Sequence, residues 1–288
     1  MTSFPRGSAL LRVVVASLLV AGCNDSARGD GTAEVAASTS TGAATAAYRQ
    51  RVRFKLPKAL TEVSGLAITP AGELLAVDDE RALVHVIDLE AQATRPYLAF
   101  GEPARPGDYE GLTILEQAIV LTDSDGRLFW GDGNQVLDWA SGLGKRFEIE
   151  GLARDPLSGL LYLASKQVRR GEGGVERLHA IDLRARALRP EADLVLDFAA
   201  ARAALGRDVL HPSALAFTDD GRSLWLLAAR ERALLGFARS GALLEAVNLE
   251  DLGRHRQAEG LALLPDGGIA IADEGGSKRA RLTVYDRG

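Results

Sequence analysis

A short phrase that occurs five times constrains the fold more than any other feature of this 288-residue sequence. Each copy has a polar residue, then Gly or Ala, then Leu, and a second short apolar run follows after a turn. Such runs between turn residues are typical of buried strands, and a recurring period of this length indicates an array of similar units. The copies are Ser64-Gly65-Leu66, Glu110-Gly111-Leu112, Glu150-Gly151-Leu152, Ser213-Ala214-Leu215 and Glu259-Gly260-Leu261.

The strands that follow each phrase predict an all-β fold, a β-propeller of five four-stranded blades, with six blades as the alternative. Four copies continue with a third and a fourth strand, whereas the fifth copy has only three. An extra strand, Val52–Leu56, precedes the first copy, and we expect it to close the last blade. The fourth strand of the third blade is expected at Asp193–Phe198, and the Ala-rich segment Ala199–Gly206 is expected to form a helical insertion before the fourth blade. An up-and-down barrel or a sandwich would leave the recurring strand order unexplained.

The first 22 residues have the pattern of an export signal. A basic start with Arg6 and Arg12 precedes an apolar run that is too short to span a bilayer, and small residues follow. Val20-Ala21-Gly22-Cys23 resembles the lipobox of bacterial lipoprotein precursors. That resemblance implies that Cys23, the single cysteine, is lipidated and becomes the first residue of the mature chain.

We therefore expect three regions: a signal peptide at 1–22, the lipidated Cys23 with a flexible linker at 23–48, and the propeller at 49–288. The linker is dominated by Ala, Gly, Ser and Thr, a composition that cannot bury enough apolar surface to fold. The second mature residue is Asn24 rather than the aspartate typical of inner-membrane retention. The resemblance thus implies a lipid-anchored protein of the bacterial cell envelope, on the outer membrane and facing the periplasm.

Composition excludes several classes of function. The chain has 34 basic and 39 acidic residues, whereas nucleic-acid-binding domains have a basic excess. A single cysteine excludes a disulfide scaffold and a multi-cysteine zinc site. We expect a monomer with no nucleic-acid partner, held at a lipid bilayer by its anchor.

Repeat geometry predicts an acidic channel mouth. In a propeller blade the first strand lies at the channel and neighbouring strands run antiparallel, so the start of strand one and the end of strand two meet at one face. Carboxylates occupy many of these positions, and dense oxygen ligands suit Ca²⁺ better than Mg²⁺. The candidate metal ligands are Asp78, Glu110, Asp123, Glu150, Glu259 and Asp273.

Further polar residues at the same face are candidates for ligand binding. Two of them, Lys166 and Arg230, are cations, and together with a metal ion they could hold a small anionic ligand. An alternative interpretation is that all these residues tie the blades together or form a solvated rim. His255 is expected to lie in a solvent-exposed loop, Arg254-His255-Arg256. The ligand-binding candidates are Glu62, Lys166, His211, Arg230 and Glu274.

Two pairs of phrases resemble the SdiA-regulated-domain family. They are Gln257–Leu261 with Ile269–Glu274, and Phe147–Leu152 with Leu161–Lys166, and the similarity extends over residues 51–286. The resemblance implies a bacterial envelope β-propeller related in shape to the phytase propellers. It implies no assigned activity.

Three functions remain open at this stage. The first is a periplasmic binding module with a Ca²⁺-stabilised face that recognises a small molecule or an envelope protein. The second is a metal-dependent hydrolase of phosphate esters, carboxylic esters or lactones, and the third is a protein–protein scaffold. The chain has no Gly-x-Ser-x-Gly elbow and no His-Glu-x-x-His motif, which favours the binding module.

The lipobox predicts the outcome of a single substitution. We expect Cys23→Ser to leave a soluble or unprocessed precursor, because the acyl chains that hold the protein at the bilayer have no attachment site. Membrane fractionation and the mass of the N-terminal fragment test this. Membrane retention with normal processing would refute lipidation.

Overall fold

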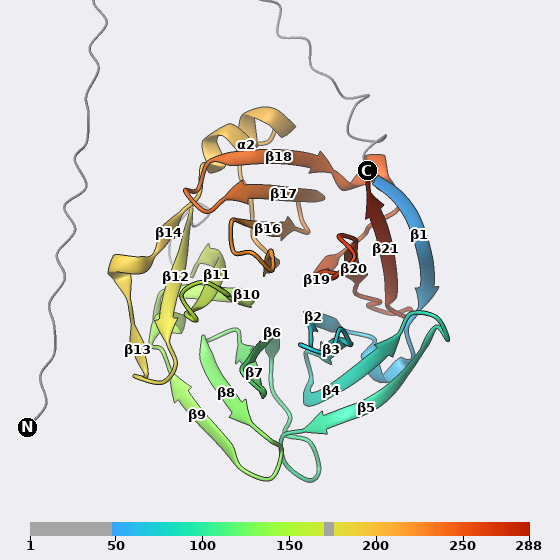
Figure 1. Ribbon diagram of the computed structural model, residues 1–288, viewed down its shortest axis with the longest axis vertical. Helices are drawn as coiled ribbons and strands as arrows, with labels where there is room; N and C mark the ends of the chain where they lie inside the picture. Colours follow the sequence, from blue (N-terminus) through green and yellow to red (C-terminus); the bar gives the residue numbers. More distant parts are fainter. Residues whose placement is uncertain (1–47, 170–175) are drawn as a thin grey trace, which may run out of the picture. The chain divides into compact units, whose positions relative to one another are not determined.

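The computed structural model describes residues 48–169 and 176–288, which form five antiparallel β-sheets arranged as the blades of a propeller. The inner strands β2, β6, β10, β15 and β19 contact one another in a closed ring around the centre (Figure 1). The predicted signal peptide, Cys23 and almost all of the predicted linker lie outside the described residues. No helix in the described part of the chain is long and apolar enough to cross a membrane.

The first four blades run from the inner to the outer strand in chain order. The first contains β2 (Val63–Ile68), β3 (Leu74–Asp78), β4 (Arg81–Asp88) and β5 (Ala93–Ala99). The second contains β6 (Tyr109–Leu115), β7 (Ala118–Asp123), β8 (Arg127–Gly131) and β9 (Val136–Ala140). The third contains β10 (Phe147–Arg154), β11 (Leu161–Val168), β12 (Arg177–Asp182), β13 (Ala187–Leu188) and β14 (Leu194–Val195). The fourth contains β15 (Ala214–Phe217), β16 (Ser223–Ala228), β17 (Ala233–Ala238) and β18 (Leu243–Asn248).

The fifth blade confirms the predicted closure. It contains β19 (Ala258–Leu263), β20 (Ile269–Asp273) and β21 (Arg281–Arg287), and its outer strand is β1 (Tyr48–Lys55). β1 pairs antiparallel with β21, so that the two ends of the propeller domain meet in one sheet. Short helical segments connect the strands: η1 (Lys58–Leu60), η2 (Leu143–Lys145), η3 (Pro190–Ala192), α2 (Phe198–Leu205) and α3 (Leu249–Leu252).

The third blade differs from the prediction at its outer edge. The expected strand Asp193–Phe198 is confirmed only at Leu194–Val195, where β14 pairs with β12, and a second short strand, β13, shares the outer position. Pro190 starts η3 between them and has no N–H for a ladder. The Asp193 carboxylate fills the gap by accepting from the Ala180 N–H at 2.9 Å. The expected helical insertion is confirmed as α2, which Asp197 caps at its start.

Apolar side chains pack between blades rather than in one central core. In β3, Leu74 and Ala76 face the fifth blade, whereas Leu75 and Val77 face the second. The second strand of every other blade divides its side chains in the same way, which gives five buried layers between neighbouring sheets. Because both faces of these strands are buried, their sequences are continuous apolar runs instead of alternating ones.

The recurring phrase packs the inner strands together at the centre. A Cβ on Gly65 would lie 2.9 Å from the backbone N of Leu112, and one on Gly111 would lie 2.9 Å from that of Leu152. Glycine is therefore required where the neighbouring inner strand approaches. The leucines of the five phrases are buried and form a ring across the channel: Leu66, Leu112, Leu152, Leu215 and Leu261.

The closeness of this packing predicts unequal costs for two equivalent substitutions. Gly111→Ala would place its Cβ 2.7 Å from the Leu152 Cβ, whereas the nearest atom to a Cβ at Gly151 is the Ala164 Cβ, 3.2 Å away. We expect Gly111→Ala to lower the free energy of unfolding by about 1–3 kcal/mol through overpacking, and Gly151→Ala to lower it much less. Chemical denaturation of both variants measures the difference. Equal costs at the two sites would contradict the packing argument.

Candidate functional site

A break in strand pairing brings the polar residue of each phrase to the channel mouth. The register of the inner strand shifts at this residue in blades one, two, three and five, which leaves Ser64, Glu110, Glu150 and Glu259 outside the ladder. Such bulges re-aim a side chain and are frequent beside functional sites. Ser213 takes the corresponding place directly before β15.

The two serines tie adjacent blades together. The Ser64 hydroxyl donates to the Tyr109 carbonyl at 2.5 Å, and the Ser213 hydroxyl donates to the Ala258 carbonyl at 2.9 Å. Both acceptors lie on the inner strand of the next blade. The interpretation of this position as an inter-blade tie is therefore right for the serines, whereas blades two, three and five place a glutamate there.

A narrow throat lies between these polar residues and the leucine ring. Its volume is about 10 Å³, and its polar walls come from Ser64, Glu110 and Glu150. A space of this size holds about one water molecule. On the other side of the leucines the channel widens to about 180 Å³.

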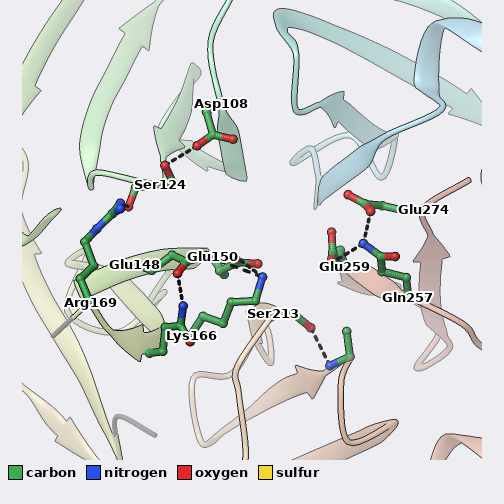
Figure 2. Close-up of polar contacts among 12 residues, drawn as sticks. Asp108, Ser124, Glu148, Glu150, Lys166, Arg169, Ser213, Gln257, Glu259 and Glu274 are labelled. Atoms are coloured by element: carbon green, nitrogen blue, oxygen red, sulfur yellow. Dashed lines mark hydrogen bonds and ion pairs between the residues drawn. The ribbon is translucent and has the colours of Figure 1, made fainter. Parts of the chain in front are cut away.

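Glu150 and Lys166 form a buried ion pair at the throat. The Lys166 Nζ lies 2.5 Å from Glu150 Oε1 and 4.0 Å from Glu148 Oε1, and Figure 2 shows its side chain reaching toward the middle of the mouth. Burial raises the pKa of Glu150 to about 7, although Lys166 opposes the shift. Burial by itself would lower the pKa of Lys166, but Glu150 and other nearby carboxylates, among them Glu259, raise it overall. The ammonium therefore stays charged.

Glu110 forms no ion pair with a cation among the residues that the structure describes. Burial, followed by the charges of Glu150, Asp108 and Glu259, raises the pKa of Glu110 to about 9. This carboxyl group holds its proton at neutral pH, because ionising it would place another negative charge in a buried site that has a single ammonium.

A second acidic group lies across the mouth from Lys166 (Figure 2). The Gln257 amide donates to Glu259 Oε1 at 3.3 Å and also to the Glu274 carboxyl group. Burial, then hydrogen bonding and repulsion from Glu259, raise the pKa of Glu274 to about 10. Burial and neighbouring carboxylates also raise the pKa of Glu62, and they raise that of Asp79 to about 7.

The aspartates at the ends of the second strands have a different role. Asp78 accepts from the Glu62 N–H at 3.1 Å, and Asp123 accepts from the Arg127 N–H at 2.8 Å. Asp273 accepts from the Arg256 N–H and lies 2.9 Å from His255 Nδ1. These three candidates hold turns and loops, and none of them lines the throat. Among residues 48–169 and 176–288, no group of three or more His, Cys, Asp or Glu is spaced to hold a metal ion.

The remaining candidates lie on the fourth blade or next to it. His211 contacts Glu231 twice, through its backbone N–H at 2.9 Å and its Nδ1 at 2.7 Å. Arg230 is exposed and forms no ion pair with a carboxylate in the described part of the chain. His255 is buried, contrary to the sequence-based assignment, because Asp273 and the Tyr285 hydroxyl both bond its ring.

Gln257 and Asp79 were not among the candidate site residues, although their positions in the repeat place both at the channel mouth. Gln257 bridges Glu259 and Glu274, and Asp79 lies among the acidic groups of the first blade. The signal for both was their place in the repeat, two residues before the start of the first strand for Gln257 and one after the end of the second strand for Asp79.

The raised pKa values predict a loss of stability at alkaline pH. A carboxyl group whose pKa is higher in the folded state stabilises the fold below its unfolded value of about 4.5, and this contribution is lost as the pH rises toward the folded value. We expect Glu110→Gln to raise the melting temperature by several degrees near pH 9 and to change it little near pH 5. The exposed Glu90→Gln is the control. Equal effects of Glu110→Gln at both pH values would contradict the buried, protonated state.

Known structures share this architecture. A crystal structure of glutaminyl cyclase from Myxococcus xanthus superposes with a TM-score of 0.58, at 13% sequence identity, over 84% of this chain and 97% of that one. Virginiamycin B lyase from Staphylococcus aureus gives a TM-score of 0.45, at 14% identity, over 83% and 74%. No family model matches the sequence, and no curated protein matches it. At such identities the likeness to the cyclase shows the fold alone, and the chain is a five-bladed β-propeller.

Proposed function

We propose that this propeller is a binding module whose acidic mouth takes one small cation at the throat. The observation that carries the proposal is the charge imbalance around Lys166, where Glu110, Glu150 and Glu259 interact with one ammonium group. Buried carboxyl groups of this kind keep protons when no further cation shares the site. A bound cation would replace those protons.

The size of the throat limits the cation. A space for about one water molecule fits a metal ion or the ammonium head of a primary amine. Ca²⁺ takes six to eight oxygen ligands, so Glu110, Glu150 and the Ser64 hydroxyl would need water molecules to complete its shell. An ammonium group needs only three acceptors, which the same side chains supply. The proposal covers both forms of the cation, and the experiment separates them.

The sequence supports a location for this module. Its signal-like segment and lipobox favour a lipid-anchored protein at the bacterial envelope, and its phrases resemble the SdiA-regulated-domain family. We include both in the proposal: the linker would hold the propeller near the membrane, where its mouth meets small solutes or an envelope protein.

Cation binding should release protons from the mouth. Titration calorimetry of the full chain near pH 7, with CaCl₂, MgCl₂ or methylammonium in buffers of different ionisation enthalpy, measures both affinity and proton release. We expect one of these cations to bind with proton release and to raise the melting temperature by several degrees. Glu110→Gln and Glu259→Gln should weaken binding about tenfold or more, because the first removes a carboxyl group that lines the throat and the second removes a neighbouring carboxyl group at the mouth.

The exposed Glu90→Gln is the matched control and should bind as the unmodified protein does. If none of the three cations binds, the proposal is wrong. Binding that is unchanged in both mouth variants would place the cation elsewhere.

A second candidate function is acid–base hydrolysis of an ester or phosphoester. The specific observation in its favour is that neighbouring carboxyl groups have unequal pKa values, about 9 for Glu110 and about 7 for Glu150. Such a pair supplies a proton donor and a proton acceptor near neutral pH. Assays of the same variants against ester and phosphoester substrates distinguish this function from binding alone, since only the hydrolase predicts turnover that Glu110→Gln abolishes.

A further inference from the structure

A second pocket lies on the fifth blade, outside the channel, and its lining is strongly basic. Its volume is about 340 Å³, within the range of small-molecule sites. The pocket shares Glu274 with the acidic mouth. Its six basic residues are Lys55, Arg254, Arg256, Lys278, Arg279 and Arg281.

The positive charge of this basic pocket is not neutralised within the described part of the chain. None of the six residues forms an ion pair with a described carboxylate. Of the two acids in the lining, Asp273 directs its oxygens to His255 and to the Arg256 N–H. The other is Glu274, whose pKa of about 10 leaves it protonated at neutral pH.

The strand register places two of the cations side by side. Lys55 on β1 is directly opposite Arg281 on β21, so their side chains leave the same face of the sheet. Like charges directly opposite each other destabilise a pair of strands. An anion bound between Lys55 and Arg281 would offset the repulsion between their positive charges.

Hydrogen bonds fix the Arg279 side chain and the backbone that carries Arg254 and Arg256, and no carboxylate neutralises these arginines within the described part of the chain. The Arg279 Nε donates to the Leu56 carbonyl at 2.6 Å, and one of its terminal nitrogens donates to the Lys55 carbonyl at 3.3 Å. The buried ring of His255 bonds Asp273 and the Tyr285 hydroxyl, and these bonds fix the backbone between the exposed residues Arg254 and Arg256. A side chain fixed before binding, as Arg279 is, loses less entropy when a ligand arrives.

From this geometry we infer that the basic pocket binds a phosphate group, carried by a soluble phosphate compound or by a lipid headgroup. Four guanidinium groups present paired N–H donors that match the oxygens of phosphate. A single carboxylate would neutralise only one of the six charges, whereas a phosphomonoester carries up to two and offers three acceptor oxygens.

Binding of defined phosphates to the full chain tests the inference. The soluble probes are inorganic phosphate and glycerol phosphate, with potassium chloride at matched ionic strength as the reference. The membrane probes are vesicles of phosphatidylglycerol with phosphatidylcholine, and of phosphatidylcholine alone. We expect saturable binding that Arg254→Gln/Arg256→Gln weakens about tenfold or more, since two charge-assisted contacts are lost.

A variant with the same change of charge elsewhere serves as the control. Arg184→Gln/Arg222→Gln removes two exposed arginines that pair with Glu116 and Asp220, and it should bind normally. Lys278→Gln/Arg281→Gln is a second pocket variant if the first fails to fold.

The pattern of binding identifies the source of the phosphate. Binding of the soluble probes assigns a free phosphate compound, and binding confined to phosphatidylglycerol vesicles assigns a headgroup. Weaker binding of the phosphate probes by the pocket variants supports the inference in either case. No binding to any phosphate probe, or equal binding by the pocket variants and the control, overturns it. Neither result bears on the throat, because the probes are anions.

Discussion

The close approach of the five inner strands is the constraint on which the rest of the structure depends. Gly65 and Gly111, at the second position of the phrase, let the backbone of the next strand come near, and the leucines that follow fill the channel. The throat is narrow for this reason, and the two glutamates that line it, Glu110 and Glu150, interact strongly because they project from a ring of this size. Their pKa values are thus a consequence of backbone packing as well as of side-chain chemistry.

Charge is distributed unevenly around the mouth. Carboxyl groups converge on the throat from blades two, three and five, with Lys166 as the ammonium among them, while six cations line the adjoining pocket on the fifth blade. Glu274 lies between the two regions and is protonated, which limits how far each neutralises the other. Two neighbouring sites of opposite charge therefore coexist in a protein whose net charge is only −5.

Particular residues show how far sequence reasoning reached. The closing strand was predicted as Val52–Leu56 and found as β1, because a blade that lacks its outer strand leaves an open edge. The outer strand of the third blade was found only in part, since periodicity does not reveal that β13 and β14 share this position or that the Asp193 side chain bonds the Ala180 N–H between them. Glu110, Glu150 and Glu259 were expected at the mouth, but Asp78, Asp123 and Asp273 bond backbone N–H groups instead.

The sequence by itself determined the number of blades, the order of their strands and the residues that reach the channel mouth. These follow from local patterns, namely apolar runs, turn residues and a phrase that recurs in register. Only the tertiary structure decided which carboxyl groups are free to bind and which cap a turn, and which are protonated. It also brought Lys55 beside Arg281, more than 200 positions along the chain. Burial and neighbours that are distant in the chain set the protonation and the contacts of these side chains, and a short stretch of sequence predicts neither.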